Sequence, residues 1–340
     1  MKKTIIICLI VLMSFIGGEA SQISKTLKLI SSFPEPESEI FFATIPSISI
    51  DSSGLIYALD NREHSVTIFD LTGKFINKFG NSGQGPGDLT SPIFIESDDE
   101  QIYIADINAL SIFNHSGEYL NKFRIYSTIA MNVNNGIIFL AQVGSDNLIS
   151  SYDQEGNRIS SFGTKYEVDY DLYKAWSTSL TDRAINSGKI LFSDENIYFV
   201  STLFADVFKY NEDGLLLSKE KLVPENLVSE IEKIFFNIGL KYKEEGKTAY
   251  GFFHDITYHQ GNFYGMTMRS FVPESPGDIL KINEKDKSIV EAYNFPSSEN
   301  KNNDIFQNIC IFIKNNQPIF IVSKKDGESD NIQISVYQIM

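Results

Sequence analysis

The sequence predicts an all-β fold built from six copies of a four-stranded antiparallel unit. The first observation behind this prediction is a repeated phrase, in which an aromatic and a polar residue lead into a tight turn that glycine closes. The closing glycines are 44, 39 and 58 residues apart, at Gly73, Gly117, Gly156 and Gly214. A unit of this size cannot bury its apolar face alone, so it must stack on its neighbours.

The second observation is a short apolar strand that recurs along the whole chain. Its six copies are rich in Ile, Tyr, Phe and Val and lie at 55–59, 102–105, 137–141, 197–200, 263–266 and 319–322. In the first unit, the alternating or apolar runs at 47–50, 66–70 and 74–79 are expected to supply the other three strands. Six such sheets are typical of a six-bladed β-propeller. The expected blades are 43–80, 91–124, 127–163, 188–222, 252–295 and 305–340.

The third observation concerns closure of the ring. The last unit ends with a third strand at 332–339 and has no fourth of its own. The alternating segment 23–30 precedes the first blade, and we expect it to supply the missing strand. Without this closure the ring would leave two sheet edges exposed.

A short helical insertion is expected between blades 4 and 5, at 223–251. From Pro224 to Phe236, apolar residues recur at 227, 228, 231, 234 and 235, with acidic residues opposite them. This spacing predicts an amphipathic helix. We interpret the helix as a cap packed on the propeller, and a lid or partner-binding helix is the alternative.

The start of the chain is typical of a secretory signal peptide. Lys2 and Lys3 precede an apolar run at 5–16, and small residues follow at 18–20. We therefore expect residues 1–20 to be removed and the remainder exported to the periplasm or the cell exterior. A lipid anchor on Cys8 is disfavoured, because that residue lies inside the apolar run with no small residue before it. No later segment approaches the roughly 20 apolar residues of a membrane span, so membrane insertion of the mature chain is not expected.

The charge of the chain excludes one class of partner. The formal net charge is −15, and an acidic surface repels phosphate backbones, so nucleic acid is not an expected ligand. Cys310 is the single cysteine after residue 20, which rules out an intrachain disulfide in the mature chain. The fold must therefore be stabilised by packing.

The order of strands predicts which face carries function. Because neighbouring strands of a blade are antiparallel, connections from second to third strand and from blade to blade share one face. The long connections at 166–186, 223–252, 268–277 and 295–304 all fall on it, and we call it the loop-rich face. The glycine-closed turns lie on the opposite face, the turn face. Since binding residues tend to lie on loops of a rigid scaffold, a ligand is expected on the loop-rich face.

Two sets of side chains are candidates for binding on that face. The first consists of four amphipathic rings within eleven residues, suited to sugar stacking or protein contacts: Tyr166, Tyr170, Tyr173 and Trp176. Loop packing is the alternative interpretation of these rings. The second is Arg269, which could anchor a carboxylate ligand or pair with Glu274.

Polar residues at the ends of the second strands are candidates for an axial site. Asp60, Asp106 and Gln142 hold these positions in blades 1 to 3. Calcium takes six to eight oxygen ligands, so two carboxylates are few for it, and turn capping is the alternative role of the two aspartates. The four histidines show no zinc spacing and there is no nucleophile elbow. No catalytic residue, metal ligand or cofactor is therefore predicted, and calcium is the alternative that stays open.

One segment carries a resemblance to a known family. The join from Phe79 to Leu89, followed by Ile102 to Asp106, resembles NHL-type repeats and looks most like the exported six-bladed propeller proteins of Bacteroidota. The resemblance covers blades 1 to 3 in sequence and blades 4 to 6 in strand pattern. It implies a propeller that serves as a scaffold for either binding or catalysis.

Two functional hypotheses follow from these residues. The first is an exported, non-catalytic propeller that binds a protein, peptide or glycan on its loop-rich face. The second is a metal-dependent hydrolase or lyase, similar to the lactonase-like propellers, that uses the axial channel. An enzyme of that kind needs at least three converging metal ligands, or a paired acid and base, on the axis.

Overall fold

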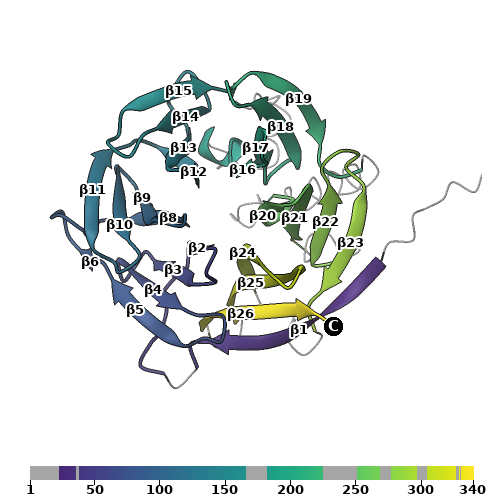
Figure 1. The fold of residues 1–340 in the computed structure, drawn as a ribbon, viewed down its shortest axis with the longest axis horizontal. Helices are drawn as coiled ribbons and strands as arrows, with labels where there is room; N and C mark the ends of the chain where they lie inside the picture. Colours follow the sequence, from purple (N-terminus) through teal and green to yellow (C-terminus); the bar gives the residue numbers. More distant parts are fainter. Residues whose placement is uncertain are drawn as a thin grey trace, which may run out of the picture.

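The computed structural model describes residues 23–35, 38–165, 182–224, 251–268, 277–296, 305–326, 329 and 331–340. Their strands form a ring of six antiparallel blades around an axis (Figure 1), so the predicted six-bladed β-propeller is confirmed. Blades 1 and 2 comprise β2 (Ser47–Ile50), β3 (Ile56–Asp60), β4 (Ser65–Phe69) and β5 (Phe75–Phe79), then β8 (Pro92–Ser97), β9 (Gln101–Asp106), β10 (Ala109–Asn114) and β11 (Tyr119–Arg124). A two-residue ladder of β6 (Asn81–Ser82) and β7 (Asp88–Leu89) lies in the connection between them.

Blades 3 and 4 repeat the same order of strands. They comprise β12 (Thr128–Asn134), β13 (Ile137–Gln142), β14 (Ile149–Tyr152) and β15 (Arg158–Phe162), then β16 (Gly188–Phe192), β17 (Asn196–Ser201), β18 (Asp206–Asn211) and β19 (Leu216–Lys221). The helical turn α2 (Asp182–Ile185) leads into blade 4. In every blade the first strand lies nearest the axis and the fourth lies on the perimeter (Figure 1).

The N-terminal strand joins blades 5 and 6 into one eight-stranded sheet. Blade 5 comprises β20 (Phe253–His259), β21 (Asn262–Thr267), β22 (Ile279–Asn283) and β23 (Ile289–Asn294), and blade 6 comprises β24 (Ile305–Lys314), β25 (Gln317–Lys325), β26 (Ile332–Ile339) and β1 (Ile23–Phe33). Residues 27–33 pair antiparallel with β26, which confirms the expected closure. Residues 23–26 continue in parallel along β23, a contact that the sequence did not predict.

The apolar core lies between adjacent blades. One cluster, for example, combines Tyr57, Leu59 and Val66 of blade 1 with Ile104 and Phe113 of blade 2, all almost fully buried. Since both faces of each sheet are covered in this way, the second strands read as continuous apolar runs. The single described cysteine, Cys310, is free, so packing holds these residues together.

The glycine of each closing turn packs against a phenylalanine of the preceding blade's outer strand. A Cβ added to the glycine would lie 2.4 to 2.6 Å from that ring in the four pairs Gly73 with Phe33, Gly117 with Phe79, Gly156 with Phe123, and Gly214 with Phe162. These glycines also have φ between 81° and 86°, a region that other residues rarely adopt. The turn phrase is therefore an interblade contact, and Phe33 of β1 supplies it for blade 1.

The Gly156→Ala variant is expected to lose about 2 to 4 kcal/mol of unfolding free energy, from a positive φ and from overpacking against Phe123. Gly144→Ala is the matched control, because Gly144 has a φ of 92° and its added Cβ would meet nothing within 4 Å. Urea unfolding of both variants measures the two contributions separately. Equal losses in the two variants would contradict the packing role of the turn glycine.

Two segments predicted from the sequence lie outside the described residues. They are the signal peptide at 1–20 and the helix expected within the 223–251 insertion, of which residues 225–250 are not described. Among the residues that the structure describes, no helix combines the length and the apolar character needed to cross a bilayer.

Candidate functional site

Asp60, at the end of β3, holds the segment through which the chain enters blade 1. Its buried carboxylate accepts hydrogen bonds from the amides of Ala43 at 2.6 Å, Arg62 at 3.0 Å and Glu63 at 3.1 Å. Its partners are thus the connection before β2 and the turn after β3. These contacts are those of a cap, which was the alternative interpretation of this residue.

Asp106 and Gln142 make equivalent contacts in blades 2 and 3. The Asp106 carboxylate accepts hydrogen bonds from the amides of Thr90 at 2.6 Å and Ser91 at 2.7 Å. Gln142 donates from Nε2 to the carbonyl of Tyr126 at 2.8 Å. In three consecutive blades the end of the second strand therefore holds the connection that enters the blade.

The charged side chains that meet on the axis come from the first strands instead. We call Glu96 of β8, Lys189 of β16 and Asp255 of β20 the axial cluster. Lys189 Nζ lies 3.1 Å from Asp255 Oδ1, and Asp255 Oδ2 accepts the amide of Ile309 in blade 6 at 3.0 Å. Glu96 interacts electrostatically with both charges. The cluster thus links blades 2, 4, 5 and 6.

The pairing register of the first strands shows how far each charged group of the axial cluster lies from the loop-rich face. Lys189 pairs with Val200, and Asp255 pairs with Met266, each one residue before the end of a second strand at the loop-rich face. Glu96 pairs with Tyr103, which lies three residues before the strand end at Asp106. The ion pair therefore lies just beneath the loop-rich face, and Glu96 enters from nearer the turn face.

Burial controls the protonation of the axial cluster. It raises the pKa of Glu96 to about 7, with Lys189 opposing the shift and Asp255 adding to it. Burial alone would lower the pKa of Lys189, but the charges of Asp255 and Glu96 outweigh it and raise that pKa above its usual range. Glu96 can therefore gain or lose a proton near neutral pH, whereas Lys189 stays charged.

Two neighbouring groups remain neutral. Burial raises the pKa of the Cys310 thiol, and its Sγ donates to the carbonyl of Ile48 at 3.3 Å. Burial also lowers the pKa of His254 to about 4, so its imidazole carries no charge at neutral pH. Within the described ranges, no three His, Cys, Asp or Glu side chains are placed to hold one metal ion.

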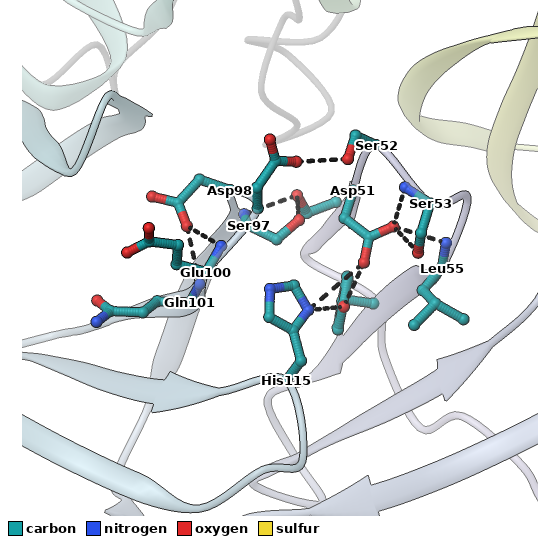
Figure 2. A network of polar contacts seen from close by, with 12 residues as sticks. Asp51, Ser52, Ser53, Leu55, Ser97, Asp98, Glu100, Gln101 and His115 are labelled. Atoms are coloured by element: carbon teal, nitrogen blue, oxygen red, sulfur yellow. Dashed lines mark hydrogen bonds and ion pairs between the residues drawn. The ribbon is translucent and has the colours of Figure 1, made fainter.

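The turn face carries a repeated polar contact between blades, seen for blades 1 and 2 in Figure 2. Asp51 accepts the Tyr57 hydroxyl at 2.7 Å, and His115 from the closing turn of blade 2 reaches the same tyrosine, with Nδ1 at 2.5 Å from its oxygen. In the next pair of blades, Tyr103 donates to Asp98 at 2.9 Å and accepts from Gln154 at 3.2 Å. His115, to which no role was assigned from the sequence, thus makes a structural contact between blades 1 and 2.

A cavity of about 390 Å³ opens on the loop-rich face of blade 2, and we call it the blade-2 cavity. Its walls are Gln84 and Thr90 of the incoming connection, residues 106–109 and the end of β11 at 122–124. Lys122 Nζ donates to the carbonyl of Asp88 at 2.9 Å. The Arg124 side chain is exposed and has no hydrogen bond or ion pair with any residue that the structure describes.

Apolar side chains flank this cavity on the same face. Ile107 is 51% exposed in its wall, and Tyr126 is 57% exposed two residues beyond Arg124. The other candidates on this face, Tyr166, Tyr170, Tyr173, Trp176 and Arg269, lie outside the described residues and stay predictions.

A comparison with known protein families identifies the family of this chain. Residues 35–218, more than half of the chain, match the family model described as 6-bladed beta-propeller (DUF5128). The chain belongs to this six-bladed beta-propeller family. The match runs from before β2 into β19, and so covers the strands of blades 1 to 4, including Glu96 and Lys189.

Solved structures share the propeller fold at low sequence identity. A protein of Bacteroides fragilis NCTC 9343 for which export is inferred is 13% identical, with a TM-score of 0.53 over 94% of this chain and 100% of that one. A streptogramin B lyase is 11% identical, with a TM-score of 0.50 over 92% of this chain and 97% of that one. A search of curated proteins gave no match. At such identities the likeness concerns the fold alone, and this propeller fold serves both enzymes and other proteins.

The sequence reasoning missed the axial cluster. Glu96, Lys189 and Asp255 are each the one Asp, Glu, Lys or Arg within a short strand otherwise rich in apolar residues. That pattern was available as a signal, because a charge in the strand nearest the axis of a propeller can be satisfied only by neighbours around the axis.

Proposed function

We propose that this propeller is an exported, non-catalytic binding protein that recognises a protein, peptide or glycan through its loop-rich face. The observation that carries the proposal is the blade-2 cavity with Arg124 at its edge. A guanidinium without a partner among the described residues, on a chain of formal charge −15, is a strong local attractor for a carboxylate. Exposed Ile107 and Tyr126 beside it add the apolar area that binding surfaces use.

The contacts of the strand-end carboxylates support binding over the metal-dependent alternative. Asp60 and Asp106 already accept several backbone amides each. A cation held by these oxygens would have to displace those hydrogen bonds to a charged group, which costs about 1.5 to 3 kcal/mol for each bond.

Acid–base catalysis on the axis is the second candidate function, and the axial cluster favours it. Glu96, whose pKa is about 7, lies within the electrostatic reach of Lys189 and Asp255. A carboxyl group that titrates near neutral pH is suited to proton transfer. This candidate predicts turnover of a bound ligand that is lost in Glu96→Gln, whereas a binding protein returns its ligand unchanged.

Binding is tested with a panel of acidic and neutral peptides and oligosaccharides, followed by calorimetry on each hit. Arg124→Ala is expected to weaken binding about ten- to a hundredfold, as for loss of a charged hydrogen bond. Arg158→Ala is the matched control, because Arg158 is also an exposed arginine of an outer strand but begins β15 next to the turn face. Equal affinity in the wild type and Arg124→Ala for every hit would contradict the proposal.

A further inference from the structure

A second cavity, of about 550 Å³, lies on the turn face. It is lined by the turns between first and second strands of three consecutive blades, at 134–135 in blade 3, 192–194 in blade 4 and 258–261 in blade 5. These turns follow β12, β16 and β20, which stand side by side around the axis in Figure 1. We call it the three-turn cavity. Its volume is within the range of small-molecule sites.

The cavity presents amide side chains on fixed turns. Asn135 and Gln260 are exposed and hold φ of 51° and 44°, so each belongs to a tight turn rather than to an extended loop. Among the described residues, Asn135 makes no side-chain hydrogen bond. An amide offers both donors and an acceptor, which suits it to neighbouring hydroxyl groups of one ligand.

Two aromatic rings and a histidine complete the lining. Phe192 packs edge-on against Phe139 at 5.0 Å, and Tyr258 stacks on Tyr198 at 5.5 Å, so both rings are held in place by the blades behind them. Burial lowers the pKa of His259, and its Nε2 is buried with no hydrogen-bond partner in the described structure. A neutral imidazole here leaves Asp194 as the single formal charge among the described residues of the wall.

Amides carried on tight turns, a neutral imidazole, aromatic rings and one carboxylate match the hydroxyl groups and apolar faces of a carbohydrate. We propose that the three-turn cavity binds a neutral sugar of one or two rings. The site is separate from the blade-2 cavity, which lies on the opposite face, so the proposed function and this inference can fail independently.

The experiment uses purified protein and saturation-transfer NMR with glucose, galactose, mannose, N-acetylglucosamine and maltose, and with ethanolamine as a cationic probe. Saturable transfer to at least one of the sugars is expected. Transfer to none of the sugars overturns the proposal, and so does transfer to ethanolamine alone, which would assign the cavity to cations through Asp194.

Variants then locate the sugar. Asn135→Gly and Gln260→Gly remove the side chains while keeping a residue that tolerates positive φ. Each is expected to weaken sugar binding about tenfold. Asn316→Gly is the matched control, since Asn316 has a φ of 61° in the equivalent turn of blade 6 and does not line the cavity. Unchanged affinity in the Asn135→Gly, Gln260→Gly double variant, with an unfolding midpoint like that of the wild type, overturns the proposal.

Discussion

Replacing Lys189 by Met is expected to lower the free energy of unfolding by about 3 to 5 kcal/mol. The Asp255 side chain is 4% exposed, and its ion pair with Lys189 at 3.1 Å supplies its one opposite charge in direct contact among the described residues. Met fills a similar volume but leaves the carboxylate buried without a counter-charge. The loss therefore comes from the stranded charge rather than from a cavity.

Urea unfolding measures this loss, and a second variant identifies its cause. Adding Asp255→Asn to Lys189→Met removes the stranded charge and keeps an oxygen for the amide of Ile309, so much of the stability should return. Lys78→Met is the control, because Lys78 is exposed on β5 and has no ion pair within the described part of the chain. A Lys189→Met variant within 1 kcal/mol of the wild type would show that the pair does not hold the inner strands together.

Replacing Glu96 by Gln is expected to stabilise the protein above neutral pH. The folded-state pKa of about 7 lies above the ordinary value of 4.5, so the folded chain keeps its proton after the unfolded chain has lost it. Stability from this group is therefore full below pH 4.5 and falls as the pH rises to 7. Ionisation of Glu96 therefore lowers the free energy of unfolding by about 3 kcal/mol in total. Gln has no proton to lose, so the variant avoids this loss.

Thermal unfolding across pH tests this expectation. Glu96→Gln and the wild type should unfold at similar temperatures at acid pH and diverge as the pH rises toward 8, with the variant more stable. Glu100→Gln is the control, because Glu100 is exposed in the turn that follows β8. A constant difference between Glu96→Gln and the wild type at all pH values would mean that Glu96 ionises as freely in the folded as in the unfolded chain.

The blade count was predictable because its signals are local. The glycine-closed turns and apolar second strands each occupy a few consecutive residues, and stacking of such units leaves few alternatives to a ring. The parallel pairing of residues 23–26 with β23 could not be predicted. The alternation of residues in β1 is the same along the part that pairs with blade 5 and the part that pairs with blade 6, so nothing in the sequence marks where the partner changes.

The candidate site was less predictable, for a geometric reason. Asp60 and Asp106 were recognisable as strand ends, but their role depends on which amides the incoming connection presents. Glu96, Lys189 and Asp255 are separated by 93 and 66 residues, and only closure of the ring brings three different first strands to one axis. A lone charge in a first strand is a local signal for an axial position, but which charges meet there depends on contacts across the ring that no local pattern encodes.

The double pairing of β1 sets an order for assembly of the chain. Ile23 pairs with Glu291 and Leu27 with Ile339, so β1 has to wait for partners that lie 268 and 312 residues further along the chain. Contacts at such separations are slow to form, because a long loop must close before they stabilise anything. Blades 1 to 4 each hold all their strands in consecutive sequence and can form during synthesis. Blade 6 cannot be completed until β26 is available, and a chain cut short before β26 would leave β1 without its antiparallel partner.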